Sequence, residues 1–157
     1  MSDLKVLEHA LPVAPLKIAA LESCTELGQK VNDYIVQFRK DTSKETLSSP
    51  VFSSYQMDNY LIECRCPRFG SGEAKGTIRE TVRGKDLFVM VDVCNYSLTY
   101  SVNGHLNHMS PDDHYQDLKR IISAANGKAH RVNVLMPFLY ETREHKEKKE
   151  ESLDYAM

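Results

Sequence analysis

The stretch Leu87-Phe88-Val89-Met90-Val91 is a short run of apolar side chains near the middle of the chain. Such a run, without alternation of polar and apolar residues, is typical of a strand buried on both faces of a parallel sheet. Outward from it, residues 132–137 (VNVLMP) predict another buried strand, and residues 16–21 (LKIAAL) predict a third. Because helix-like segments alternate with these runs, the sequence predicts an α/β domain with a mainly parallel sheet flanked by helices.

The first helix-like segment is residues 24–40. Ser23, just before it, is a candidate N-cap, and Glu26 follows three residues later, which is the spacing of a capping box. We therefore expect an amphipathic helix with a polar outer face. Its apolar positions are Leu27, Val31, Tyr34, Ile35 and Phe38. Residues 41–50 have no apolar period and are predicted to form a polar connection.

A second helix is predicted between Ser110 and Gly127. Ser110 suits the N-cap and Pro111 the first helical position, while Asp112 and Asp113 favour the positive end of the helix dipole. Gly127 ends the pattern. The buried stripe is predicted to be Tyr115, Leu118, Ile121, Ile122 and Ala125.

Length and composition limit the classes of protein. A chain of 157 residues suits one domain, and 41% hydrophobic with 27% charged residues is the composition of a globular protein. The formal charge of −2 gives no electrostatic case for binding nucleic acid or an anionic membrane. No apolar run approaches the roughly 18 residues of a spanning helix. The four cysteines are scattered, so we expect reduced thiols in a cytoplasmic protein.

A glycine-rich segment lies between two strand-like runs, residues 60–66 and 77–82. It reads Arg68-Phe69-Gly70-Ser71-Gly72-Glu73-Ala74-Lys75-Gly76. Its spacing differs by one residue from the dinucleotide fingerprint, and it lacks the Gly-Lys-Ser/Thr of a Walker loop. The spacing favours a β-turn in which glycine supplies the positive φ. Further on, Asn103-Gly104 marks a possible second hairpin within residues 95–109.

Two polar clusters have both a functional and a structural interpretation. His105, His108 and His114 could bind a metal with the nearby aspartates, but solvation and helix capping explain them better. Residues 143–146 (REHK) follow a predicted strand, where a parallel sheet binds ligands and a basic group can meet a phosphate. The charge pattern alone favours the solvated start of a surface helix over residues 144–151.

Several of these segments, in this order, resemble one enzyme family, ribose-phosphate pyrophosphokinase. The similar segments are residues 68–73 (RFGSGE), residues 80–89 (ETVRGKDLFV) and Pro137 followed by Arg143, with further likeness at residues 17–27 and 112–120. The resemblance covers the chain from about Leu16 to its end and concerns only the N-terminal of the family's two similar domains. It implies a phosphoribosyltransferase-like fold with a protruding β-hairpin near residues 66–82. The expected divisions are an N-terminal extension, residues 1–15, and an ATP-side domain, residues 16–157, apparently truncated at its C-terminus.

The resemblance also implies an activity and a nucleotide site. The family transfers pyrophosphate from Mg-ATP to ribose 5-phosphate, which yields phosphoribosyl pyrophosphate and AMP. Phe69 would stack on adenine, Glu73 would accept a hydrogen bond from its amino group, and Arg143 would contact the phosphates. The positions equivalent to the family's ATP-binding residues are Phe69, Ser71, Glu73, Arg143, Glu144 and His145.

The same resemblance implies partners and sets limits. ATP and Mg²⁺ are the expected ligands, ribose 5-phosphate binds only the complete enzyme, and the metal ligands lie outside this chain. A homo-oligomer is expected, in which the hairpin reaches a neighbouring subunit's active site. The chain departs from the family at Ser71, at Glu144-His145 and in the longer segment 95–109. We therefore expect no turnover by the chain alone, and a non-catalytic assembly or regulatory module remains the alternative.

Overall fold

The computed structural model describes residues 13–46 and 56–142, and its centre is a parallel sheet. The strands are β1 (Leu16–Ala20), β4 (Asp86–Met90) and β7 (Arg131–Leu135), in the order β1-β4-β7. Both pairings are parallel, with Phe88 opposite Ile18 on one side and opposite Asn133 on the other. The predicted α/β architecture is confirmed, and the LFVMV run supplies the central strand.

The segment after the first helix extends the sheet on the far side of β1. The Ile18 N–H donates to the Tyr60 carbonyl oxygen at 2.9 Å, and the Ile62 N–H donates to the Ile18 carbonyl oxygen at 2.9 Å. The single strand predicted for residues 60–66 is therefore divided: residues 60–62 lie beside β1, and β2 (Cys64–Arg65) begins a separate hairpin. The segment that follows β1 lies on the side of β1 away from β4, whereas β7, which follows β4, lies on the side of β4 away from β1. The position between β1 and β4 is therefore a topological switch point.

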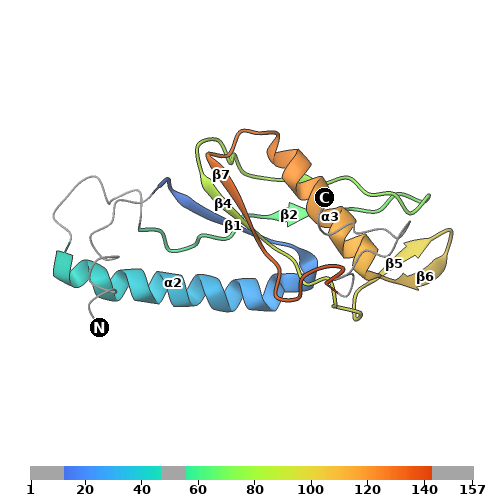
Figure 1. Cartoon of the computed structure of the whole chain (residues 1–157), viewed down its shortest axis with the longest axis horizontal. Coiled ribbons are helices and arrows are strands. Elements are labelled where there is room, and N and C mark those ends of the chain that lie inside the picture. Colours follow the sequence, from blue (N-terminus) through green and yellow to red (C-terminus); the bar gives the residue numbers. More distant parts are fainter. Residues whose placement is uncertain (1–12, 47–55, 143–157) are drawn as a thin grey trace, which may run out of the picture.

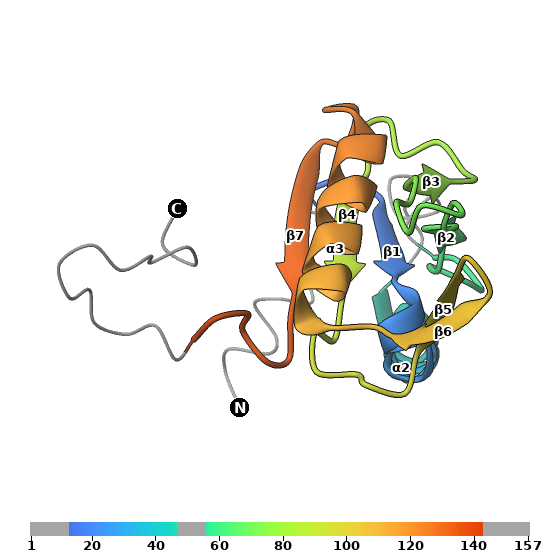
Figure 2. The same ribbon diagram turned by 90° about the vertical axis from the view of Figure 1, so that its right-hand side faces the viewer.

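Two helices lie on opposite sides of the sheet, as Figures 1 and 2 show. A short 3-10 turn, η1 (Glu22–Cys24), leads into α2 (Thr25–Thr46), and α3 (Pro111–Ala125) follows β4. The side chains of β4 alternate between the two layers. Leu87 and Val89 pack in a cluster with α3, whereas Phe88 and Met90 pack with residues of α2.

The predicted start of α2 is correct to within one residue, but the prediction is wrong in its cap, its C-terminal end and part of its buried face. The Ser23 hydroxyl does not cap the helix, because it accepts a hydrogen bond from the Asp92 N–H at 3.1 Å. Residues 41–46 belong to the helix instead of the predicted connection. Three of the predicted apolar positions are exposed: Leu27, Tyr34 and Phe38. The helix instead packs against β1 through Gly28, where a Cβ would lie only 2.5 Å from the Ala20 Cβ.

The predicted boundaries of α3 are confirmed. The Ser110 hydroxyl accepts a hydrogen bond from the Asp113 N–H, and the Asp113 carboxylate accepts one from the Ser110 N–H, which completes a capping box. Asn126 takes a left-handed φ of 50° just before Gly127. Leu118, Ile121 and Ala125 are buried, while Ile122 is 37% exposed.

Strand β7 is placed as predicted but is not buried. It forms the outer strand of the three-stranded sheet, and Val132, Val134 and Leu135 are each about two-fifths exposed. An apolar run predicts burial on both faces only where strands and helices cover it. Among the described residues, nothing pairs with the outer edge of β7.

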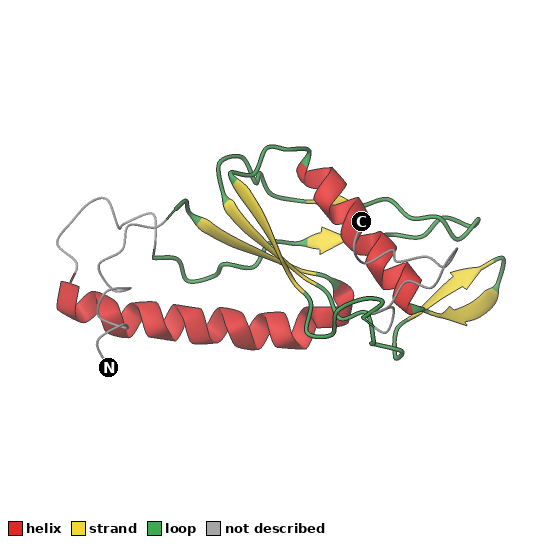
Figure 3. Ribbon diagram, in the orientation of Figure 1, coloured by secondary structure: helices red, strands yellow, loops and turns green. Residues whose placement is uncertain are grey.

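Two antiparallel hairpins extend from the same end of the molecule, as Figure 3 shows. The first joins β2 to β3 (Thr77–Ile78), and the second joins β5 (Thr99–Val102) to β6 (His105–His108). Asn103 and Gly104 form the turn of the second with φ of 49° and 81°, as predicted for an Asn-Gly hairpin. In the described part of the chain, neither helix is long and apolar enough to cross a membrane.

Candidate nucleotide-binding site

The tip of the first hairpin is a closed loop, residues 68–74. Arg68 and Ala74 form an antiparallel bridge at its base, and the Phe69 N–H donates to the Glu73 carbonyl oxygen at 2.7 Å. The Gly72 N–H donates to the Phe69 carbonyl oxygen at 2.9 Å, and Gly72 has a φ of +90°. The predicted β-turn, with glycine at the left-handed position, is therefore confirmed.

The loop presents the three described residues of the predicted site on its surface. The Phe69 ring is 54% exposed, and Ser71 and Glu73 are exposed beside it. The Ser71 hydroxyl donates to a Glu73 carboxylate oxygen at 3.0 Å. An exposed ring can stack on a flat heterocycle, and a carboxylate on the same loop can accept a hydrogen bond from its amino group.

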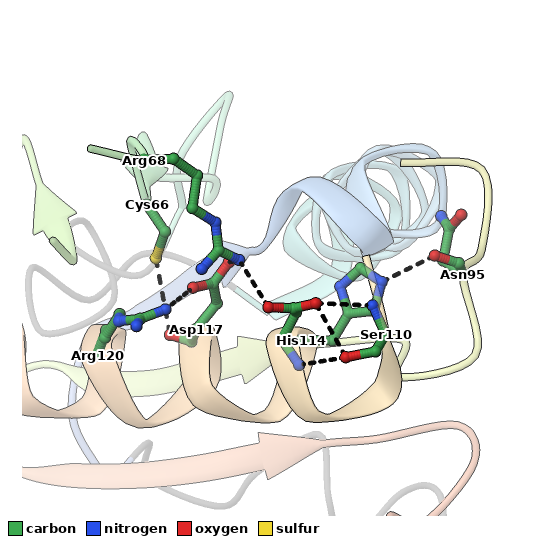
Figure 4. Close-up of polar contacts among 8 residues, drawn as sticks. Cys66, Arg68, Asn95, Ser110, His114, Asp117 and Arg120 are labelled. Atoms are coloured by element: carbon green, nitrogen blue, oxygen red, sulfur yellow. Dashed lines mark hydrogen bonds and ion pairs between the residues drawn. The ribbon is translucent and has the colours of Figure 1, made fainter. Parts of the chain in front are cut away.

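A charged cluster fixes the base of the loop to α3, as Figure 4 shows. The Arg68 guanidinium lies 2.9 Å from Asp117 Oδ2 and 3.9 Å from Asp113 Oδ1. Arg120 binds the second oxygen of Asp117 at 2.6 Å. Burial raises the pKa of the Asp117 carboxyl, although the hydrogen bond from Arg120 and the charge of Arg68 lower it. Since its carboxylate is costly to bury, Asp117 depends on both guanidinium groups.

His105, His108 and His114 do not gather into a metal site. His114 is buried, and its Nε2 lies 2.8 Å from the Asn95 carbonyl oxygen, which ties α3 to the segment after β4. His105 and His108 are exposed on β6, and His108 Nδ1 lies 3.1 Å from the Tyr96 carbonyl oxygen. Asp113 is engaged in the capping box. Within residues 13–46 and 56–142, no group of three or more His, Cys, Asp or Glu side chains could hold a metal ion.

An open pocket of about 580 Å³ lies between the two hairpins and α3. Ser71, Gly72 and Glu73 form one wall, while Tyr100 and Asn107 belong to the wall from the β5–β6 hairpin. Asp113, Gln116 and Arg120 of α3 also line it. Ser71 and Glu73, chosen from the sequence, therefore face a cavity.

The other three predicted site residues, Arg143, Glu144 and His145, lie outside the described residues, as does the helix predicted for residues 144–151. The chain that leads to them is held by Tyr140. Its hydroxyl donates to Asp112 Oδ1 at 2.8 Å, and its ring stacks on Tyr115 with centroids 4.2 Å apart. The first turns of α3 thus hold both the 68–74 loop and the approach to Arg143.

A second cavity, of about 530 Å³, was not predicted from the sequence. It lies at the carboxyl end of β1, between the start of α2, the base of the first hairpin and α3. Cys64 and Cys66 line it, and their thiols donate to the carbonyl oxygens of Ala20 and Asp117. Burial raises the pKa of Cys64 to about 11 and that of Cys66 to about 12. These thiols are protonated at neutral pH, as expected for structural cysteines.

Sequence reasoning missed the residues that support the loop, Arg68, Asp117 and Tyr100. A weak signal existed for Asp117, since this acidic residue falls between apolar positions on the buried side of α3. No periodicity could have paired it with Arg68, which is 49 positions away.

Comparison with known families gives one match over nearly the whole chain. Residues 16–157 match the family model for the N-terminal domain of ribose phosphate pyrophosphokinase. No curated protein matches the chain in sequence.

Proposed function

The chain belongs to the family of the N-terminal domain of ribose phosphate pyrophosphokinase, and we propose that it supplies the nucleotide-binding half of such an enzyme. The proposed reaction transfers the pyrophosphoryl group of Mg-ATP to ribose 5-phosphate and releases AMP. The observation that carries the proposal is the 68–74 loop, in which Phe69 is exposed and Glu73 lines an open pocket.

The described residues fit the base of ATP. The Phe69 ring offers a face for stacking, and the Glu73 carboxylate offers an acceptor for the exocyclic amino group of adenine. Arg68 is not available for phosphate, because Asp117 and Asp113 hold its guanidinium. We assign the phosphates to Arg143, whose planar, permanently charged guanidinium suits that task.

The proposed chemistry is a displacement at phosphorus. The anomeric hydroxyl oxygen of ribose 5-phosphate bonds to the β-phosphorus of ATP and loses its proton. The bond from the β-phosphorus to the oxygen that bridges to the α-phosphorus breaks, and AMP leaves with that electron pair. Mg²⁺, bound to the phosphates, would neutralise negative charge in this step. The contribution of this chain is to hold and orient the nucleotide.

We further propose that the chain has no turnover by itself and that it forms a homo-oligomer through the family's assembly surface. The family resemblance assigns the ribose 5-phosphate site and the metal ligands to residues beyond this chain. Formation of AMP that depends on ribose 5-phosphate, by the purified 157-residue chain, would contradict this proposal.

The test of the nucleotide site is ATP binding by titration calorimetry. Arg143→Ala should weaken binding by about 1.5–3 kcal/mol, the typical value of a charged hydrogen bond. Phe69→Ala should weaken it through lost stacking. The matched control is Arg79→Ala, which removes an exposed guanidinium that forms a surface ion pair with Glu63 at 3.5 Å. Absence of saturable ATP binding by the unaltered chain refutes the nucleotide site.

One observation favours the alternative, a non-catalytic assembly or regulatory module. Ser71 occupies the position where the family usually has an acidic residue, and its hydroxyl binds the Glu73 carboxylate. A module of this kind would associate with complete synthetase subunits without binding ATP. ATP binding by the unaltered chain and by Arg143→Ala separates the two functions, because a pure assembly module has no ATP binding to lose.

A further inference from the structure

The β5–β6 hairpin packs against the loop that the proposed function assigns to the nucleotide. A Cβ on Gly72 would lie 3.3 Å from Val102 Cγ2, so the backbone at the tip of the loop touches β5. Residues of this hairpin also form the wall of the pocket opposite Ser71 and Glu73. The hairpin lies within the segment 95–109, and the proposed reaction assigns it no role.

Arg68 connects the hairpin to the loop. Its guanidinium carbon lies 4.8 Å from the centroid of the Tyr100 ring, in cation–π geometry. The same guanidinium forms the ion pair with Asp117, and the Arg68 side chain is only 10% exposed. The backbone of Arg68 also forms the bridge with Ala74. Contacts that hold the Arg68 guanidinium in place therefore also hold the base of the loop.

We propose that the β5–β6 hairpin positions the 68–74 loop, with Tyr100 as the positioning residue that acts through Arg68. A loop held in its binding shape before the ligand arrives loses less conformational entropy on binding. The proposal concerns the free chain, and its effect on nucleotide affinity rests on the proposed function.

The chemistry of the pocket indicates which part of a nucleotide it takes. Glu73 and Asp113 bring carboxylates to it, which would repel a phosphate. Asn107 and Gln116 add amides that can both donate and accept hydrogen bonds. Two guanidinium groups also line it, those of Arg68 and Arg120, and both are bound to Asp117, while His105 adds an imidazole. This lining suits the edge of a purine base, and the hairpin would form its outer wall.

The experiment compares Tyr100→Leu with Tyr100→Phe. Leucine removes the ring that faces the guanidinium, whereas phenylalanine keeps it. The first readout is hydrogen exchange in the absence of nucleotide, at the amides of Phe69 and Gly72, which are bonded within the loop, and of Lys75, which donates to the Pro67 carbonyl oxygen just below its base. We expect Tyr100→Leu to accelerate their exchange about three- to tenfold, the factor for a cation–π contact of this kind, and Tyr100→Phe to restore it.

Two further variants strengthen the test. Tyr96→Leu is the matched control, since Tyr96 lies in the same segment, is 59% exposed and should leave the loop unchanged. Arg68→Lys keeps a positive charge near Asp117 but loses the planar group over the ring, and should accelerate exchange as Tyr100→Leu does. If Tyr100→Leu destabilises the whole chain, Arg68→Lys decides the question.

The second readout is ATP affinity, which should fall by a similar factor in Tyr100→Leu and recover in Tyr100→Phe. Loop amides that exchange at the rate of the unaltered chain in both Tyr100→Leu and Arg68→Lys overturn the proposal. Accelerated exchange without ATP binding by the unaltered chain supports the positioning role and refutes the nucleotide site. The two failures are therefore distinguishable.

Discussion

Replacement of Asp117 by alanine tests the charged cluster that fixes the loop to α3. The side chains of Asp117 and Arg68 are 9% and 10% exposed, and that of Arg120 is 20% exposed. Asp117→Ala would leave two guanidinium groups without this carboxylate in a largely buried place. Removal of one partner from a buried pair costs about 3–5 kcal/mol, whereas an exposed pair contributes about 0–1 kcal/mol. Because Arg120 retains some access to water, we expect about 3 kcal/mol.

The assay is urea unfolding followed by circular dichroism. With a slope of about 2 kcal/mol per molar, a loss of about 3 kcal/mol lowers the urea midpoint by about 1.5 M. The matched control is Asp58→Ala, which breaks a surface pair with Lys40 in which the Asp58 side chain is 93% exposed. Asp117→Asn keeps the side-chain volume and one acceptor, so its midpoint should fall between the two. If Asp117→Ala and Asp58→Ala unfold within about 0.5 kcal/mol of each other, the cluster has only the stability of a surface pair.

Three other changes have expected outcomes of their own. Gly76→Ala places a Cβ 2.5 Å from the backbone oxygen of Arg120, so we expect a destabilised chain with a lower urea midpoint, and an unchanged midpoint would show that the first hairpin can move away from α3. Hydrogen bonding by Arg131 lowers the pKa of Asp86 in the folded state, so the stability that this carboxylate adds is present above its unfolded pKa of about 3.9 and is lost as the pH falls through the folded value. Asp86→Asn should therefore reduce stability at pH 7 and flatten the acid decline, and parallel pH profiles would contradict the reasoning. Alkylation of Cys66 at pH 8 should be far slower in the native chain than in urea, since burial raises its pKa to about 12, and equal rates would show an accessible thiolate.

The sequence predicted the central elements because local chemistry determines them. The apolar run at Leu87 to Val91 favours a strand buried on both faces, and Ser110-Pro111 can start a helix without help from distant residues. Asn103-Gly104 likewise specifies its own turn.

The errors occur where distant partners decide the outcome. Serine is a residue type that favours the N-cap, but the Ser23 hydroxyl accepts a hydrogen bond from the Asp92 N–H, which is 69 positions away. Val132 and Val134 are as apolar as a core strand, yet burial depends on what lies beyond the edge of the sheet. Tyr34 and Phe38 fit the helical period, but they stack on each other at the surface, with ring centroids 6.4 Å apart.

The candidate site divides in the same way. Turn chemistry predicted the shape of the 68–74 loop, and the family resemblance selected Phe69, Ser71 and Glu73 on it. The Tyr100 ring and the Asp117 carboxylate come from other elements, and only the folded chain brings them to Arg68. The predictions for Arg143, Glu144 and His145 remain predictions.

The order of strands in the sheet has a consequence for synthesis of the chain. Leu16 pairs with Asp86, so the β1–β4 ladder cannot form until about 70 further residues have been synthesised after β1. At a translation rate of about 5–20 residues per second, β1 waits roughly 4–14 s for its partner. Residues available sooner are those of α2 and of the segment 60–62, which already contact β1 on its other side. During translation, α2 and the segment 60–62 can therefore assemble around β1 before β4 arrives to join them to α3 and β7.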